Sequence, residues 1–368
     1  RSRELGIPCV VGTGEATEKI KCGQNVTISC SEGEQGQVYT GLLDFEVQVV
    51  MLDSIPETKT KVALNVGDPE HALALSFLPN DGVGLARLEF IISSYIGVHP
   101  RALLEFDRIK DRTVRNRIEE ITRHYQQKED YFVDKLSQGV GTIVAAFYPK
   151  PVVVRMSDFK SNEYAHLLGG EQFEPREENP MIGWRGASRY YSKQYQQSFG
   201  LECAAMKRVI DDFGLKNLTL MIPFCRTVEE GKKVIAVMKE FGISQAQIPI
   251  YVMCEIPSNV LVAAEFLEVF DGFSIGTNDL TQLALGLDRD SELVSEIFDE
   301  RNEAVQRLVK EVIGVARSSG KYIGICGDAP STYPEFARFL VECGIDTLSL
   351  SPDVAISTRI AVAECEGI

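Results

Sequence analysis

The segment FSIGTNDLTQ, residues 273–282, joins a short apolar run to a polar turn. An apolar run that breaks into Gly-Thr-Asn-Asp indicates a buried parallel strand that delivers polar side chains at its carboxyl end. Two neighbouring apolar runs share this design, because 251–254 is followed by Glu255 and 322–325 is followed by Cys326. Three strand ends that carry a Glu, an Asn-Asp pair and a Cys make the chain a candidate enzyme.

Comparable apolar runs recur along the chain after about residue 57, and helix-like stretches separate most of them. The predicted strands are 61–66, 83–87, 152–155, 218–223, 250–255, 273–277, 322–326 and 347–351, and the helix-like stretches are 103–136, 228–241, 258–270, 293–319 and 332–342. Eight strands that alternate with helices predict an α/β fold, a parallel (β/α)₈ TIM barrel enlarged by insertions. An open doubly wound sheet is the alternative, but no G-x-G-x-x-G follows a first strand.

The amino-terminal segment has a different pattern, with short β-like runs between turns at 10–14, 25–29 and 35–39. We expect residues 1–45 to be the last strands of a small β-containing domain, residues 46–56 to be a linker and residues 57–368 to form the barrel. The chain starts at Arg1 rather than Met and shows no signal peptide, so we expect it to begin inside a longer protein.

The chain has 368 residues and a formal net charge of −15. This acidity argues against a duplex nucleic-acid binder, which needs a basic face, and favours solubility. No run of about eighteen apolar residues is present, so we expect no membrane span. The nine cysteines lie far apart, without a C-x-x-C pair or a nearby histidine. Such cysteine usage argues against a zinc site or a disulfide framework and favours a reducing, cytoplasmic compartment.

Two arginines close predicted strands, Arg87 at the end of 83–87 and Arg155 at the end of 152–155. Arg87 has an alternative structural role as a partner of Glu89 or of a helix end. Arg155 follows three valines, and burial of an unpaired guanidinium there would be costly. Since the guanidinium fork matches phosphate oxygens, two such arginines suggest a dianionic ligand.

Two carboxylates, Glu255 and Asp279, lie about one βα unit apart and can therefore project from adjacent strands. Two carboxylates over a barrel mouth suit Mg²⁺, which takes one or two carboxylates and leaves positions for substrate oxygens. The alternative is that each acid caps or begins a helix. Asn278 also has two interpretations, a donor to a phosphoryl or carboxylate oxygen and a helix cap.

Cys326 stands at a predicted strand end beside Gly327, which opens access to the thiol. A buried thiol is more often a small hydrophobic residue than a catalyst, which is how we interpret Cys203, Cys254 and Cys343. None of the four histidines has a metal-ligand spacing, and we assign none of them a catalytic role.

Several long motifs, in the same order, resemble the carboxyl-terminal part of the phosphoenolpyruvate synthase group in the family of PEP-utilising enzymes. These motifs are PNDGVGLARLEF (79–90), VVRMSD (153–158), GWRG (183–186), MCEIPSN (253–259), GTNDLTQ (276–282) and GICG (324–327). Residues 161–164 and 174–180 favour the synthase group over the sugar-transport phosphotransferase of the same family, which would carry Gly-Gly-Asp-Lys after Arg155. Residues 3–8 resemble the segment just after the phosphorylated histidine of the family's swivelling domain.

The resemblance implies a complete enzyme that converts pyruvate, ATP and water to phosphoenolpyruvate (PEP), AMP and phosphate through a phosphohistidine. This chain would hold the pyruvate and PEP site, while the phosphohistidine and the nucleotide-binding domain would lie upstream. Residues 1–45 would then be the end of the swivelling phosphohistidine domain. The family also implies a homodimer formed through the barrel.

The same resemblance implies roles for the matching residues. Glu255 and Asp279 would bind Mg²⁺, and Cys326 would exchange a proton with the methyl carbon of pyruvate. The residues implied to bind substrate are Arg87, Arg155, Arg185, Gly276, Thr277, Asn278 and Arg289. Two alternatives stay open, a pyruvate phosphate dikinase that shares this site and a non-catalytic pyruvate/PEP-binding remnant.

Overall fold

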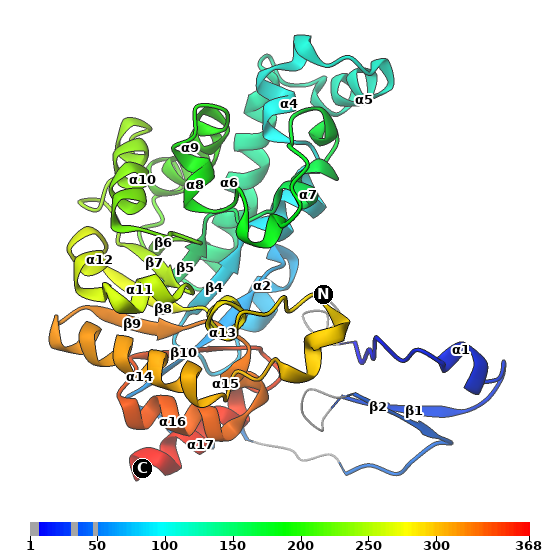
Figure 1. The fold of residues 1–368 in the computed structure, drawn as a ribbon, viewed down its shortest axis with the longest axis vertical. Coiled ribbons are helices and arrows are strands. Elements are labelled where there is room, and N and C mark those ends of the chain that lie inside the picture. The colour runs from blue at the N-terminus through cyan, green and yellow to red at the C-terminus, as the bar shows by residue number, and fades with distance from the viewer. Residues whose placement is uncertain (1–6, 31–35, 47–50) are drawn as a thin grey trace.

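A closed barrel of eight parallel strands forms the centre of the chain (Figure 1), whose computed structural model describes residues 7–30, 36–46 and 51–368. The strands are β3 (Lys61–Val66), β4 (Val83–Arg87), β5 (Val152–Arg155), β6 (Leu218–Ile222), β7 (Ile250–Cys254), β8 (Gly272–Ile275), β9 (Tyr322–Ile325) and β10 (Thr347–Leu350). They follow one another around the barrel in chain order, and β10 closes it by pairing with β3. The predicted TIM barrel is confirmed, and the open doubly wound sheet is excluded.

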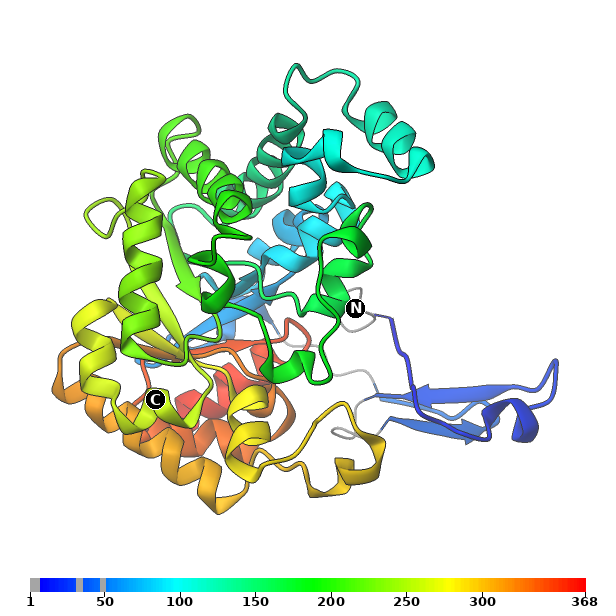
Figure 2. The same cartoon turned by 45° about the horizontal axis from the view of Figure 1, so that its top comes forward.

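Helices surround the barrel and connect its strands (Figure 2). They are α2 (Pro69–Ser76), α3 (Leu88–Ile91), α4 (Pro100–Leu104), α5 (Arg112–Thr122), α6 (Lys128–Ala146), α7 (Ser161–Ala165), α8 (Ala187–Tyr190), α9 (Gln196–Asp211), α10 (Val228–Glu240), α11 (Pro257–Leu261), α12 (Ala263–Val269), α13 (Thr277–Leu285), α14 (Glu303–Ser318), α15 (Ala329–Thr332), α16 (Pro334–Cys343) and α17 (Ala355–Glu366). The elements from α3 to α9 are inserted around β5, and in both views they extend the molecule on one side of the barrel.

Helix boundaries differ from the predicted ones where a local capping group decides them. In the predicted stretch 103–136, α5 begins after Asp111, whose side chain accepts the backbone N–H groups of Thr113 and Val114. The predicted helix 293–319 starts later, because Asn302 caps α14 and the residues before it form a 3₁₀ turn. These caps satisfy helix-end N–H groups that a periodicity argument does not consider.

The amino-terminal part forms a two-stranded antiparallel hairpin, which is drawn to one side of the barrel (Figure 1). It pairs β1 (Val26–Ser29) with β2 (Gln37–Thr40), and a short helix, α1 (Ala16–Lys19), precedes it. The predicted run at 10–14 forms no strand. Residues 3–6, which carry part of the motif similarity, lie outside the described residues.

The interior of the barrel has its own small apolar cluster, whereas the larger core lies between the barrel and the helices. The interior cluster consists of Leu85, Val153, Met221, Met253 and Cys326. Side chains alternate along each strand, so Met221 of β6 belongs to the interior while Leu220 and Ile222 belong to the outer core. Each fully buried aliphatic side chain of this kind stabilises the fold by about 1.5–3 kcal/mol. Within the described residues, no helix has the length and apolar character that a membrane span needs.

Gly84 is required where β4 closely approaches the side chain of Ser349 on β10. Leu64 pairs with Val83 and Asn65 pairs with Leu85, so Gly84 is the extra residue of a bulge. A Cβ atom at Gly84 would collide with the side chain of Ser349 on β10. The bulge and the close approach together leave no room for a larger residue.

We predict that Gly84→Ala lowers the free energy of unfolding by about 1–3 kcal/mol, because the added methyl group overpacks the barrel interior. Gly314→Ala is the matched control, since a Cβ at this position of α14 meets nothing within 4 Å. The control should raise the free energy of unfolding by about 0.5–1 kcal/mol. Denaturant unfolding of both variants gives the two values. Equal effects of the two substitutions would contradict the close approach.

Candidate active site

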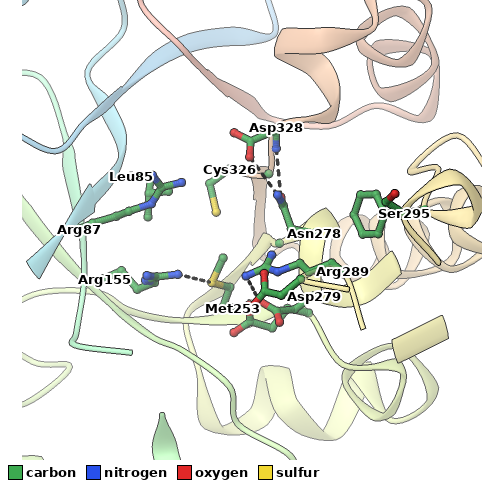
Figure 3. A pocket seen from close by; sticks show the side chains of 15 residues that line it. Leu85, Arg87, Arg155, Met253, Asn278, Asp279, Arg289, Ser295, Cys326 and Asp328 are labelled. Carbon is green, nitrogen blue, oxygen red and sulfur yellow. Dashed lines mark hydrogen bonds and ion pairs between the residues drawn. The ribbon is translucent and has the colours of Figure 1, made fainter. Parts of the chain in front are cut away.

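A pocket of about 490 Å³ opens at the carboxyl ends of the barrel strands (Figure 3). Its lining comes from the ends of β4, β5, β7 and β9, from α13 and from the segment after α13. The lining residues are Leu85, Arg87, Arg155, Met253, Glu255, Gly276, Asn278, Asp279, Arg289, Asp290, Ser295, Phe298, Cys326, Gly327 and Asp328. The structure thus brings together all the residues predicted for the site except Thr277 and Arg185, which do not line this pocket.

Glu255 is fully buried directly after β7. Its Oε1 accepts the backbone N–H of Phe224 at 2.6 Å, while its Oε2 has no hydrogen-bond partner among the described residues. Burial raises the pKa of this carboxyl, and the nearby carboxylates of Asp279 and Asp158 raise it further. Ile256, not Glu255, precedes α11 as its cap residue, so the alternative of a simple helix cap does not describe Glu255.

Asp279 lies in the first turn of α13, where the helix dipole favours a negative charge. Arg185 donates from Nη1 to Oδ1 of Asp279 at 3.3 Å, and Arg289 lies 3.6 Å from Oδ2. The other side of the Arg185 guanidinium binds Asp158, with Nε to Oδ1 at 3.0 Å and Nη2 to Oδ2 at 2.6 Å. Arg185 therefore connects the carboxylate of the loop after β5 with that of the first turn of α13, and it does not line the pocket itself.

Glu255 and Asp279, two of the four carboxylates that line the pocket, fit the predicted Mg²⁺ site in their chemistry. Glu255 offers a buried oxygen without a hydrogen bond, and a cation near it would offset the repulsion from Asp279. Gly276 leaves space beside that oxygen, since a Cβ there would lie 3.1 Å from Oε2 of Glu255. Within the described ranges, no group of three or more His, Cys, Asp or Glu side chains forms a metal site. A two-carboxylate site suits Mg²⁺, which keeps water and substrate oxygens as further ligands.

Arg87 and Arg155 end neighbouring strands and are register partners of β4 and β5. Arg155 donates from Nη2 to Oε1 of Glu89 at 3.0 Å, and its Nη1 lies 3.8 Å from Oδ2 of Asp158. Its Nε is buried without a hydrogen-bond partner in the described part of the chain. Glu89, considered from the sequence as a partner of Arg87, thus binds Arg155. Two positive charges from adjacent strand ends face the pocket together.

The Cys326 thiol lies in the floor of the pocket and points towards Met253 (Figure 3). It is 1% exposed, and its Sγ lies 3.6 Å from the carbonyl oxygen of Ile275. Burial raises the pKa of this thiol to about 11, although a hydrogen bond with Ser274 and the charge of Arg155 act to lower it. At neutral pH the thiol therefore carries its proton, next to two positive charges that would stabilise its ionised form.

Asn278 lies inside α13 and bridges to the loop that follows β9. Its Nδ2 donates to Oδ2 of Asp328 at 2.9 Å, and its Oδ1 accepts the backbone N–H of Asp328 at 3.2 Å. Gly276 holds the cap position of α13, so the helix-cap interpretation of Asn278 is not what the structure shows. Thr277 is fully buried, and its hydroxyl packs against Gly327.

Three carboxylates that organise the site were not predicted as site residues: Asp158, Asp328 and Glu89, the last of which was considered only as a partner of Arg87. Each follows a predicted strand-end residue by two or three positions and lies within or directly after a quoted motif. Because the first residues after a barrel strand still lie at its mouth, an acid at that spacing is a usable signal.

We predict that Arg185→Met costs about 3–5 kcal/mol of unfolding free energy, because it leaves the buried carboxylates of Asp158 and Asp279 without their shared partner. Arg301→Met is the matched control, since Arg301 binds Asp299 and Glu335 on the surface. The control should cost only a small fraction of that value, because exposed ion pairs contribute little. Thermal and denaturant unfolding measure both. A loss at Arg185 as small as that at Arg301 would contradict this role.

Two family descriptions match the chain, "PEP-utilising enzyme, PEP-binding domain" over residues 45–366 and "PEP-utilising enzyme, mobile domain" over residues 1–33. The phosphoenolpyruvate synthase of Synechocystis sp. is 60% identical over 99% of this chain and 45% of that protein. Those of Aquifex aeolicus and Escherichia coli are 51% and 54% identical over 99% of this chain, and 48% and 46% of those proteins. The chain spans about half the length of these relatives. The resemblance inferred from the motifs is confirmed, and the chain belongs to the family of PEP-utilising enzymes.

Proposed function

We propose that this chain is the pyruvate and PEP half-site of a phosphoenolpyruvate synthase. In the complete protein, ATP, pyruvate and water would become AMP, PEP and phosphate through a phosphohistidine. The observation that carries this proposal is that three arginines, four carboxylates and one thiol line the same small pocket at the barrel mouth. We assign the phosphohistidine to the mobile domain, whose end would be residues 1–45, with 46–56 as a linker to the barrel of 57–368.

Arg87 and Arg155 would bind the phosphoryl group as it moves from the histidine to the enolate oxygen of pyruvate. The P–N bond breaks and a P–O bond forms, and the positive charges stabilise the negative charge spread over the phosphoryl oxygens. Asn278 assists, because its amide donates one hydrogen to Asp328 and keeps a second for the substrate. Arg289 lines the same pocket and is a further candidate for this contact.

Glu255 and Asp279 would hold Mg²⁺, which would supply positive charge opposite the carboxylate and carbonyl oxygens of pyruvate. Arg185 fixes Asp279 from behind through their hydrogen bond at 3.3 Å. Gly276 keeps the space between Glu255 and Met253 open, since a Cβ there would lie 2.6 Å from the Met253 methyl group. These residues thus orient the substrate with its methyl group towards the apolar floor.

Cys326 would exchange the proton of the methyl carbon. Towards PEP, the C–H electron pair forms the enolate and the proton passes to Sγ, and in the reverse direction the thiol returns it to carbon. With its pKa raised to about 11 by burial, the thiol is protonated at neutral pH and ready to donate. Arg155 and Arg87 stabilise the thiolate that the forward direction requires.

Titration with oxalate, a mimic of the enolate, tests the half-site. We predict binding that requires Mg²⁺ and strengthens as pH rises, because a proton and a cation compete for Glu255, whose pKa burial and Asp279 raise. In Glu255→Gln, added Mg²⁺ should no longer strengthen oxalate binding. In Glu265→Gln, on the exposed face of α12, Mg²⁺ should strengthen it as in the wild type. Calorimetry at several pH values measures this. An absence of oxalate binding to the wild-type chain would favour a non-catalytic remnant.

Loss of the thiol should separate proton transfer from binding. We predict that Cys326→Ala lowers the methyl-proton exchange of pyruvate by at least about 100-fold while oxalate still binds. Cys254→Ala is the matched control, because Cys254 is also fully buried but belongs to the core outside the barrel. NMR of the pyruvate methyl signal in deuterated buffer follows the exchange. Full exchange by the Cys326 variant would remove this thiol from the mechanism.

The synthase and the dikinase differ in the acceptor of the second phosphoryl group, water or phosphate. The three relatives compared above are all named phosphoenolpyruvate synthase, which supports water. Phosphate consumption by the protein with its upstream domains would instead indicate a dikinase. On the resemblance and the cysteine usage, we also propose a cytoplasmic homodimer that binds neither nucleic acid nor membranes.

A further inference from the structure

Glu202 is a fully buried carboxyl group on α9, and it does not line the pocket. Burial of such a group is costly unless hydrogen bonds compensate for the lost water. Here burial raises the pKa of Glu202 to about 7, even though its hydrogen bonds with Ser157 lower it. Burying this carboxyl costs free energy of folding. Its contacts therefore indicate which role it has in the structure.

Both oxygens of Glu202 bind one residue of the loop that follows β5. Oε2 accepts the backbone N–H of Ser157 at 3.1 Å, and Oε1 accepts its hydroxyl at 2.5 Å. The carbonyl oxygen of Ser157 accepts the hydroxyl of Tyr190 at 2.6 Å. Ser157 is therefore held at its N–H, its side chain and its carbonyl group.

Two tyrosines extend this contact into a chain of hydroxyl groups that ends at Glu202. The Tyr195 hydroxyl donates to that of Tyr164 at 2.5 Å, and the hydroxyls of Tyr164 and Ser157 are 2.7 Å apart. With Ser157 donating to Glu202, each hydroxyl in the chain donates to the next group. The carboxylate is the acceptor at the end of the chain, and a side-chain amide in its place would offer a competing donor.

The loop that Glu202 holds carries the charges of the site. Ser157 lies between Arg155, which lines the pocket, and Asp158, which binds Arg185. The backbone of Asp158 also donates to Glu89, which binds Arg155. The preceding residue is fixed by the barrel, since Met156 donates to Met221 of β6 at 3.0 Å. At Ser157, the acceptor for both the backbone N–H and the hydroxyl is Glu202 of α9.

We propose that Glu202 is a positioning residue of the active site, which holds Ser157 and thereby sets the placement of Arg155 and Asp158 around the pocket. Its effect on substrate rests on the proposed function, whereas its effect on the loop does not.

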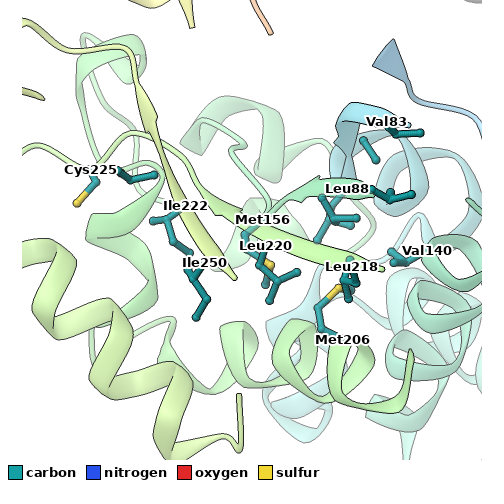
Figure 4. Close-up of a cluster of buried hydrophobic side chains, with 14 of the residues drawn as sticks. Val83, Leu88, Val140, Met156, Met206, Leu218, Leu220, Ile222, Cys225 and Ile250 are labelled. Carbon is teal, nitrogen blue, oxygen red and sulfur yellow. The ribbon is translucent and has the colours of Figure 1, made fainter. Parts of the chain in front are cut away.

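The experiment uses the 368-residue chain with three substitutions. Glu202→Gln keeps the volume of the side chain and removes the charge that the buried carboxyl can carry, so the variant should fold. It breaks the sequence of donors, because the amide adds a donor where the carboxylate only accepts. Ser157→Ala removes the hydroxyl contact and keeps the N–H contact. Val209→Ala is the control, because Val209 is fully buried on the same helix. Met206 and Val209 of that helix belong to the same buried cluster as Leu218 of β6, and Figure 4 draws Met206 and Leu218 in it. Val209→Ala therefore weakens packing and leaves the carboxyl contacts intact.

The first measurement is hydrogen exchange of the backbone amides of residues 155–160 without ligand. We expect faster exchange at Ser157 and Asp158 in Glu202→Gln, a smaller increase in Ser157→Ala and no local increase in Val209→Ala. The second is oxalate binding with Mg²⁺, which should weaken about 10–100-fold in Glu202→Gln, as for other residues that orient a metal or substrate ligand from behind. Val209→Ala should bind like the wild type despite its lower unfolding midpoint.

Ser157→Ala combined with Glu202→Gln should weaken oxalate binding no more than Glu202→Gln alone, because both act through the same contact. Unchanged amide exchange and unchanged oxalate affinity in Glu202→Gln would overturn the inference. If the wild-type chain binds no oxalate, the proposed function fails, and the amide exchange alone decides the role of Glu202. Weakening of equal size in Val209→Ala would show that loss of packing, not loss of positioning, is responsible, and would also overturn it.

Discussion

The guanidinium of Arg185 joins the loop after β5 to the first turn of α13 by binding Asp158 on one side and Asp279 on the other. Its side chain is 4% exposed, so the ion pairs form almost without water. Removing one member of such a buried group costs more folding free energy than the intact group contributes, because each partner left behind is an unpaired buried charge. Arg185, Asp158 and Asp279 therefore form a single unit at the pocket mouth, because the loss of any one of them leaves a buried charge without its partner.

This unit explains how so many charges share a small pocket. Glu255, Asp279 and Asp158 repel one another, and the rise in the pKa of Glu255 expresses that repulsion together with the burial. Arg155 and Arg185 offset part of this repulsion, because Arg155 lies near Asp158 and Arg185 pairs with Asp158 and Asp279. Under the proposed function, charges fixed in advance would stabilise a charged transition state without having to reorganise. The packing of the barrel against its surrounding helices stabilises the fold and offsets the free energy lost by burying these charges.

The barrel and most of its mouth could be predicted because they follow from short-range patterns. Apolar runs mark the strands, and a strand end in a barrel fixes where the next side chains point, so position alone predicted that Glu255, Asp279 and Cys326 would lie at the barrel mouth, where they line the pocket. Arg185 was placed in the site only by resemblance to a family, and its partners were not foreseen. Glu202 was missed altogether, because its contact with Ser157 spans 45 residues and no local pattern records it.

The apolar floor of the pocket has a stereochemical consequence under the proposed function. Cys326 lies among Leu85, Met221 and Met253, so the thiol meets a bound substrate from the barrel side alone. The phosphoryl donor would belong to another domain and would approach through the open mouth. A planar enolate between them would receive its proton on one defined face. PEP that carries one deuterium at a defined methylene position, protonated in tritiated water, would therefore give pyruvate with a chiral methyl group of a single handedness.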